Sequence, residues 1–153
     1  MTPEPAGNPT GPTTAQRLAQ HPRWELRDGV LIGGDGELAG WRVMLVDDWG
    51  TTFTRNGQSW AVGAGRLPAL ALVPDLADDA TAGIVLGMVR AWAANVDGLV
   101  EIYAGTKQAV VVVSIEEPGA PWATRIRRLG ETVGDAAGQC LLACWARDES
   151  QCP

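Results

Sequence analysis

Histidine, cysteine and lysine are scarce in this sequence of 153 residues, which contains one, three and one of them respectively. A Ser–His–Asp or Cys–His catalytic arrangement would depend on His21, which we instead expect to cap the end of a short helix before Pro22. A tetrahedral zinc site needs about four ligands, and the chain offers only three cysteines and this distant histidine. We therefore predict no catalytic residue, no metal site and no cofactor.

The three cysteines do not form a disulfide framework. Cys140 and Cys144 lie one helical turn apart on a predicted apolar stripe, where cysteine behaves as a small hydrophobic residue. We expect both to be core residues, and Cys152 to be the more reactive thiol. An odd number of cysteines without a disulfide pattern is typical of a reducing compartment.

Long apolar runs and a surplus of basic charge are also missing. No segment approaches the roughly 20 apolar residues of a membrane-spanning helix, and no secretory signal opens the sequence. The net charge of -6 disfavours nucleic acid as a direct partner, because phosphate contacts need a basic surface. These absences predict a cytoplasmic protein that binds neither membranes nor nucleic acid directly.

Turn signals dominate the first part of the chain. Asp28–Gly29 and Asn56–Gly57 each separate two short apolar-containing runs, and such pairs favour the tight turns of β-hairpins. Another turn is expected at residues 48–50, after the strand in "WRVMLVDDWG". Residues 23–63 are therefore predicted to form an antiparallel meander.

The segment "VPDLADDATAGIVLGMVRAW" could be either a cluster of reactive carboxylates or the start of a buried helix. We predict a helix over residues 78–95, in which Asp75 or Asp78 caps the first turn and Asp79 interacts favourably with the helix dipole. Apolar residues then recur at helical spacing. The carboxylates are thus interpreted as structural.

This helix contains Gly83 and Gly87, each of which costs about 1 kcal/mol relative to alanine. We expect close packing against a neighbouring element as the compensation.

Three strands and a helix are predicted in the second half. The strands lie in "LVEIYAG", "QAVVVVSIEE" and "PWATRIRR", and the unbroken run 109–113 fits a central strand. The helix spans residues 133–147, with Thr132 as its cap. The fold class is α+β: one antiparallel sheet of about six to seven strands, with helices 78–95 and 133–147 packed on it. Two smaller sheets joined through the middle helix are the alternative.

The hydrophobic content of 46% is enough for the core of one domain. We place this domain at residues 13–148, between a disordered tail at 1–12 and a flexible tail at 149–153.

Tryptophan is unusually common, with seven residues against one Tyr and one Phe. Alternation places Trp41, Val43 and Leu45 on one strand face, so Trp41 is expected in the core. Trp49, in an acidic turn, is the best candidate for an exposed anchor, because tryptophan is enriched at interface hot spots. The predicted partner-binding residues are Asp47, Asp48, Trp49, Arg125 and Arg127.

Three segments, "HPRWELRDGVL", "PDLADDATAGIVLGMVRAW" and "LGETVGDAAGQCLLACW", resemble small uncharacterised accessory proteins of bacteriophages and prophages from GC-rich bacteria. The ending is also similar to HicB-type antitoxin domains, although the basic DNA-binding extension is absent. The resemblance implies a protein that works in the cytoplasm of an infected or lysogenic bacterial host. It supplies no catalytic residues.

The leading hypothesis is an inhibitor that binds a host protein or complex and occludes its surface, as anti-CRISPR proteins do. One alternative is a small enzyme or small-molecule-binding domain whose site is assembled from scattered residues. The other is a self-assembling structural protein, for which a homodimer patch would be diagnostic. A deep acidic pocket would favour the enzyme, and an exposed aromatic on a shallow surface would favour the binder.

Overall fold

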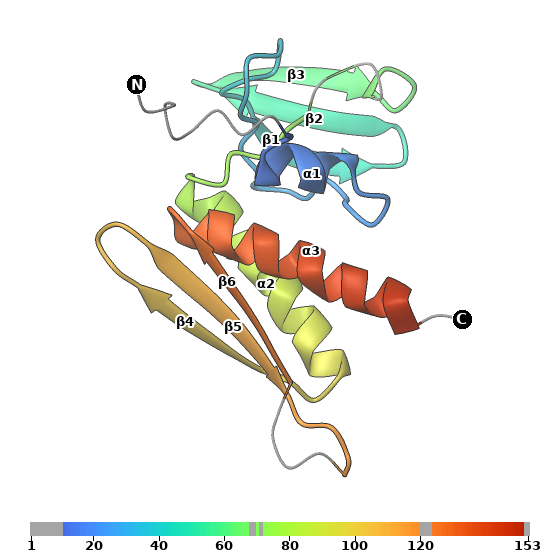
Figure 1. The fold of residues 1–153 in the computed structure, drawn as a ribbon. Helices are drawn as coiled ribbons and strands as arrows, with labels where there is room; N and C mark the ends of the chain where they lie inside the picture. Colours follow the sequence, from blue (N-terminus) through green and yellow to red (C-terminus); the bar gives the residue numbers. More distant parts are fainter. Residues whose placement is uncertain (1–10, 68–69, 71, 120–123, 152–153) are drawn as a thin grey trace, which may run out of the picture.

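The computed structural model describes residues 11–67, 70, 72–119 and 124–151 (Figure 1). Their elements, in chain order, are α1 (Thr14–Gln20), β1 (Arg42–Asp47), β2 (Gly50–Arg55), β3 (Gln58–Gly63), α2 (Asp79–Asn95), β4 (Leu99–Ala104), β5 (Ala109–Ile115), β6 (Thr124–Gly130) and α3 (Val133–Gln151). The strands form two separate antiparallel sheets, ordered β1-β2-β3 and β4-β5-β6. The class is α+β as predicted, but the single sheet of six to seven strands is wrong.

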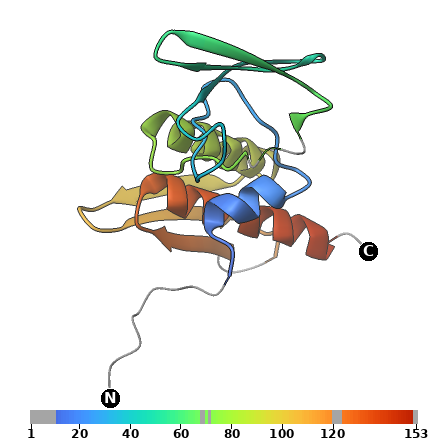
Figure 2. The ribbon, with the colours of Figure 1, turned by 90° about the horizontal axis from the view of Figure 1, so that it is seen from above.

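The sheets are separate because α2 lies between them (Figure 2). Val85 and Val89 of this helix are fully buried in the core that α2 and α3 share with the second sheet, whereas Ile84 packs against the core of the first sheet. A helix that buries apolar side chains in two directions needs an apolar layer on each side. The periodicity showed the apolar content of α2 but did not reveal that it serves two cores.

The first sheet, β1-β2-β3, which we call the meander, contains one of the two predicted hairpin turns. Asn56 and Gly57 have φ of 51° and 79° and join β2 to β3, as their sequence predicted. Asp28–Gly29 is also a turn, but residues 11–27 form no strand before it, so the predicted hairpin there is wrong. Instead, the segment after this turn lies along β1, where the N–H of Val43 donates to the carbonyl of Val30 over 2.8 Å.

The second sheet has β5 in the centre, as its continuous apolar run predicted, and α2 and α3 cover one of its faces (Figure 1). Cys140 and Cys144 are buried in this core, also as predicted. Thr132 caps α3, since its hydroxyl oxygen accepts from the N–H of Asp135 over 3.1 Å. The helix continues to Gln151, beyond the predicted end at residue 147.

The small helix α1 packs against α3. Leu18 is fully buried in the same core, and the ring of His21 stacks on Trp145 with centroids 4.5 Å apart. His21 also caps the C-terminal end of α1, as expected. Cys152, Trp122 and residues 1–10 of the predicted N-terminal tail lie outside the described residues. Within the described ranges, no helix is both long and apolar enough to cross a membrane.

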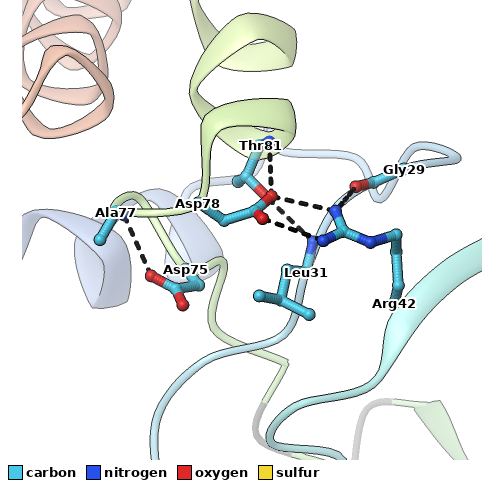
Figure 3. A network of polar contacts seen from close by, with 7 residues as sticks. All are labelled: Gly29, Leu31, Arg42, Asp75, Ala77, Asp78 and Thr81. Atoms are coloured by element: carbon cyan, nitrogen blue, oxygen red, sulfur yellow. Dashed lines mark hydrogen bonds and ion pairs between the residues drawn. The ribbon is translucent and has the colours of Figure 1, made fainter. Parts of the chain in front are cut away.

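One ion pair links the meander to α2 (Figure 3). Asp78 caps the helix, accepting from the N–H of Thr81 over 2.9 Å. The Arg42 guanidinium, on β1, donates to both carboxylate oxygens of Asp78 over 3.0 and 2.9 Å, and to the carbonyl of Gly29 over 2.7 Å. Such two-pronged pairs are geometrically specific, so this contact fixes how the helix start meets the first strand.

The fully buried Thr81 continues this network. Its hydroxyl donates to Asp78 and accepts from the N–H of Leu31, both over 2.8 Å. The N–H of Asp75 in turn donates to the carbonyl of Leu31 over 2.8 Å. The side-chain hydrogen bond with Arg42 holds the pKa of Asp78 well below its usual value of 3.8, although burial opposes the shift. The network therefore depends on an ionised Asp78.

Gly83 and Gly87 do not pack closely against a neighbour, so that expectation is wrong. Both face solvent, and a Cβ built on either would meet nothing within 4 Å. Gly134 is different, because a Cβ there would collide with the carbonyl oxygen of Leu76.

We expect Gly87→Ala to raise the free energy of unfolding by about 0.5–1 kcal/mol, because alanine loses less conformational freedom in a helix. Gly134→Ala should lower it by more than about 1 kcal/mol, since the packed backbone must move. Urea unfolding of the two variants tests this contrast. A destabilised Gly87→Ala would show that the exposed face of α2 has been assigned wrongly.

We expect Asp78→Ala to lower the free energy of unfolding by about 2 kcal/mol at neutral pH, because the variant loses a helix cap and leaves Arg42 unpaired. Asp79→Ala, in the same helical turn, should cost only about 0.5 kcal/mol.

The cost of Asp78→Ala should depend on pH. The folded pKa of Asp78 lies below its unfolded value, so its contribution is complete above about pH 4 and disappears as the pH falls through the folded pKa. The difference between wild type and Asp78→Ala should therefore shrink on acidification in denaturant titrations. A difference that does not change between about pH 7 and pH 3 would contradict this role.

Candidate protein-binding site

The five predicted binding residues lie on two different sheets. Asp47, Asp48 and Trp49 form the turn between β1 and β2, whereas Arg125 and Arg127 lie on β6. All five are exposed. Since the two sheets lie on different sides of α2, the structure does not bring these residues into one site (Figure 2).

The β1–β2 turn holds the backbone of Trp49 from both sides. Asp47 Oδ1 accepts from the N–H of Trp49 over 2.9 Å and from that of Gly50 over 3.1 Å. The carbonyl of Trp49 accepts from the N–H of Ala64 over 2.9 Å. The indole, by contrast, is 87% exposed. A large aromatic side chain is thus presented to solvent on a braced turn.

Gly50 sets the path of this turn. Its φ is 152°, and a Cβ at this position would collide with the carbonyl oxygen of Val62 on β3. Only glycine allows β3 to approach the turn so closely.

Three further apolar side chains are exposed next to the turn. Met44, Leu45 and Val46 are between 41% and 49% exposed, and they precede the turn directly on β1. Leu45 and Val46 pair with Thr52 and Thr51, so their side chains point to opposite faces of the hairpin, and the exposed apolar residues gather around its end. We call Met44, Leu45, Val46 and Trp49 the hairpin patch.

A β-bulge explains why alternation misplaced Leu45. Val43 is opposite Phe53, but the next paired residue, Leu45, is opposite Thr52, so β1 contains one extra residue. The bulge moves Leu45 off the buried face on which Trp41 and Val43 lie. Trp41 is in the core as predicted, while the prediction for Leu45 is wrong.

Carboxylates surround the hairpin patch. Asp47 and Asp48 follow it in the turn, and Asp28 accepts from the N–H of Val46 over 3.1 Å. These three side chains form no ion pair with another described residue. An apolar surface with an unneutralised acidic rim suits a partner with an apolar pocket and basic surroundings.

The described residues give little support to an acid–base site. The carboxyl groups with shifted pKa values are Asp78 and Asp148, and in both the pKa is lowered, with a hydrogen bond from an arginine among its causes. Asp148 accepts from Arg23 over 2.6 Å and from the indole of Trp92 over 2.9 Å. These contacts link α3 to α2 and to the segment that follows α1. They are typical of an ionised carboxylate with a structural role.

A pocket of about 430 Å³ lies beside α1, where Gln16, Gln20, Trp24 and several leucines line it. The indole N–H of Trp24 is buried and has no partner among the described residues. The described lining contains no carboxylate, cysteine or histidine. This lining is not acidic. A second pocket, of about 580 Å³, does contain the carboxylates of Asp35 and Asp75 in its lining.

The two described cysteines lie side by side in the core and are both buried. Their mutual hydrogen bond and burial raise the pKa of the Cys144 thiol. In the described part of the chain, no three His, Cys, Asp or Glu side chains gather as metal ligands would.

Compared with protein-family models, curated proteins and solved structures, the chain shows no significant match. The site is therefore interpreted from its own chemistry.

Trp49→Ala should leave the free energy of unfolding unchanged within about 0.5 kcal/mol, because the side chain is almost fully in solvent. Gly50→Ala, one residue further on, should be destabilising because its Cβ has no space. Thermal and urea unfolding of both variants would check this. A large stability loss in Trp49→Ala would show that the indole is structural, not a free anchor.

Proposed function

We propose that this protein acts by binding another protein through the hairpin patch and its acidic rim. The single observation that carries the proposal is Trp49, which is 87% exposed on a turn whose backbone is hydrogen-bonded on both sides. Because the backbone at Trp49 is already held, binding has to order only the indole side chain, which favours affinity. Exposed tryptophan also has an unfavourable hydration that a partner's pocket would relieve.

The sequence resemblance supports the wider setting of this proposal. Phage accessory proteins commonly work by occluding a surface of a host machine, and such an activity requires no catalytic residue. We propose that the partner is a bacterial host protein or complex of defence or regulation, such as a CRISPR effector. We place this binding in the host cytoplasm. The predicted residues Asp47, Asp48 and Trp49 take part in this surface, whereas Arg125 and Arg127 belong to a different face.

The test is affinity capture of partners from a bacterial host lysate by tagged wild type, Trp49→Ala and Trp49→Phe. We expect a stoichiometric partner that resists nuclease treatment. Trp49→Ala should weaken its binding by roughly 30-fold or more, as truncation of a central hot spot does. Trp49→Phe, which keeps an aromatic ring, should retain part of the affinity. Arg90→Ala, an exposed position on α2, is the control and should bind like wild type.

A partner that binds Trp49→Ala and wild type equally would overturn the assignment of the hairpin patch. A partner that disappears with nuclease would mean that the contact runs through nucleic acid. With a purified partner, Asp47→Asn combined with Asp48→Asn should slow association and reduce its dependence on salt. Charges at the rim of an interface act mainly on the association rate constant.

A further inference from the structure

The β4–β6 sheet has a second face that no described element covers. α2 and α3 lie on one side of the sheet, and Figure 1 shows no helix or strand against the other. Leu99 and Tyr103 of β4 are 63% and 58% exposed there, and Leu129 of β6 is 41% exposed. We call this side the outer face. It is a surface distinct from the hairpin patch, and the inference below does not rest on the proposed function.

The strand register arranges the outer face in rows. One row consists of Tyr103, Val110 and Leu129, and is apolar from edge to edge. The next row has Glu101 on β4, Val112 on β5 and Arg127 on β6. Because side chains alternate along a strand, these two rows and the row of Leu99, Ser114 and Arg125 point to the same side.

Charge is distributed unevenly across these rows. The acidic residue Glu101 lies on one edge strand, and the basic residues Arg125 and Arg127 lie on the other. None of the three forms an ion pair with another described residue. The apolar residues Val110 and Val112 separate the two edges. Val112 is itself only 7% exposed and Ser114 is the central residue of the third row, so the outer face has small apolar and polar side chains along β5, an acidic residue on β4 and basic residues on β6.

We propose that the outer face binds the outer face of a second copy of this chain. A two-fold axis that runs along the strands superposes the β4 edge of one copy on the β6 edge of the other. Glu101 then faces Arg127 of the second copy, and Tyr103 faces Leu129. The valines of the central strand meet their own equivalents, as they must in a two-fold interface in which the same patch serves both subunits.

The charges select this arrangement over the other two-fold arrangement. An axis that lies across the strands would place Glu101 opposite Glu101 and Arg127 opposite Arg127, which costs energy. The axis along the strands forms the Glu101–Arg127 pair twice. Sheets packed in this way lie about 10 Å apart, a distance that side chains of this size fill.

The test is a charge swap in the full chain, with the dissociation constant measured by analytical ultracentrifugation. Wild type should be a dimer. Glu101→Arg and Arg127→Glu should each weaken the dimer by roughly tenfold or more, because each variant faces like charge twice. The variant that combines both swaps should recover near-wild-type association, since the pair is restored in reverse.

Two controls keep the test independent of folding and of the hairpin patch. Arg90→Glu changes the same charge on α2 and should leave the dimer intact, as should Trp49→Ala. Circular dichroism shows whether each variant is folded. The proposal is overturned if folded wild type remains monomeric at every concentration, if the single swaps leave a dimer unchanged, or if the double swap fails to restore it.

Discussion

The contact between Asp78 and Arg42 fixes the first turn of α2 against the first strand of the meander. Each sheet has only three strands, and such a sheet is stable only when it packs against another layer. α2 provides that layer for both. The ion pair, with Thr81 and the carbonyl of Gly29, fixes the first turn of α2 to β1, so that one helix start determines where the meander lies.

This connection gives a structural reason for the position of the hairpin patch. β1 begins at Arg42 and ends at Asp47, so the strand anchored by the ion pair carries the patch at its other end. The bulge after Val43 then turns Leu45 outward, and the turn at Asp47 and Asp48 presents Trp49. One short segment therefore contains the anchor at Arg42, the exposed indole and the turn that holds the backbone of Trp49.

The hairpin patch and the outer face differ in the partner that they suit. The hairpin patch is apolar with an acidic rim, and it does not complement itself, since two copies would bring carboxylates together. The outer face has opposite charges on opposite edges and does complement itself. A dimer formed through the outer face would present two hairpin patches, and a partner with two sites would gain affinity from effective concentration.

Local features of the fold could be predicted from the sequence. The Asn56–Gly57 turn, the cap at Asp78, the central position of β5 and the exposure of Trp49 all follow from residue types that act within a few positions of each other. Each is determined by backbone conformation, by a single hydrogen bond or by a continuous apolar run.

Features that depend on distant residues could not be predicted. Asp78 and Arg42 are 36 positions apart, and the sequence contains nothing that pairs them. The bulge in β1 breaks the alternation that placed Leu45 on the same face as Trp41, so the exposure of Leu45 was missed. The apolar stripe of α2 does not show that Ile84 packs against a second core, so a single sheet was preferred and the two sheets of the structure were only the alternative.

Native-state hydrogen exchange, compared between wild type and Asp78→Ala, tests the central role of the ion pair most directly. In wild type, the amides of Val43 and Phe53 in the meander and those of Val111 and Val113 in β5 should exchange through the same global unfolding. In Asp78→Ala, the meander amides should lose more protection than those of β5, because the meander loses its ion pair with the start of α2. Equal loss in both sheets, or no loss in the meander, would contradict the account.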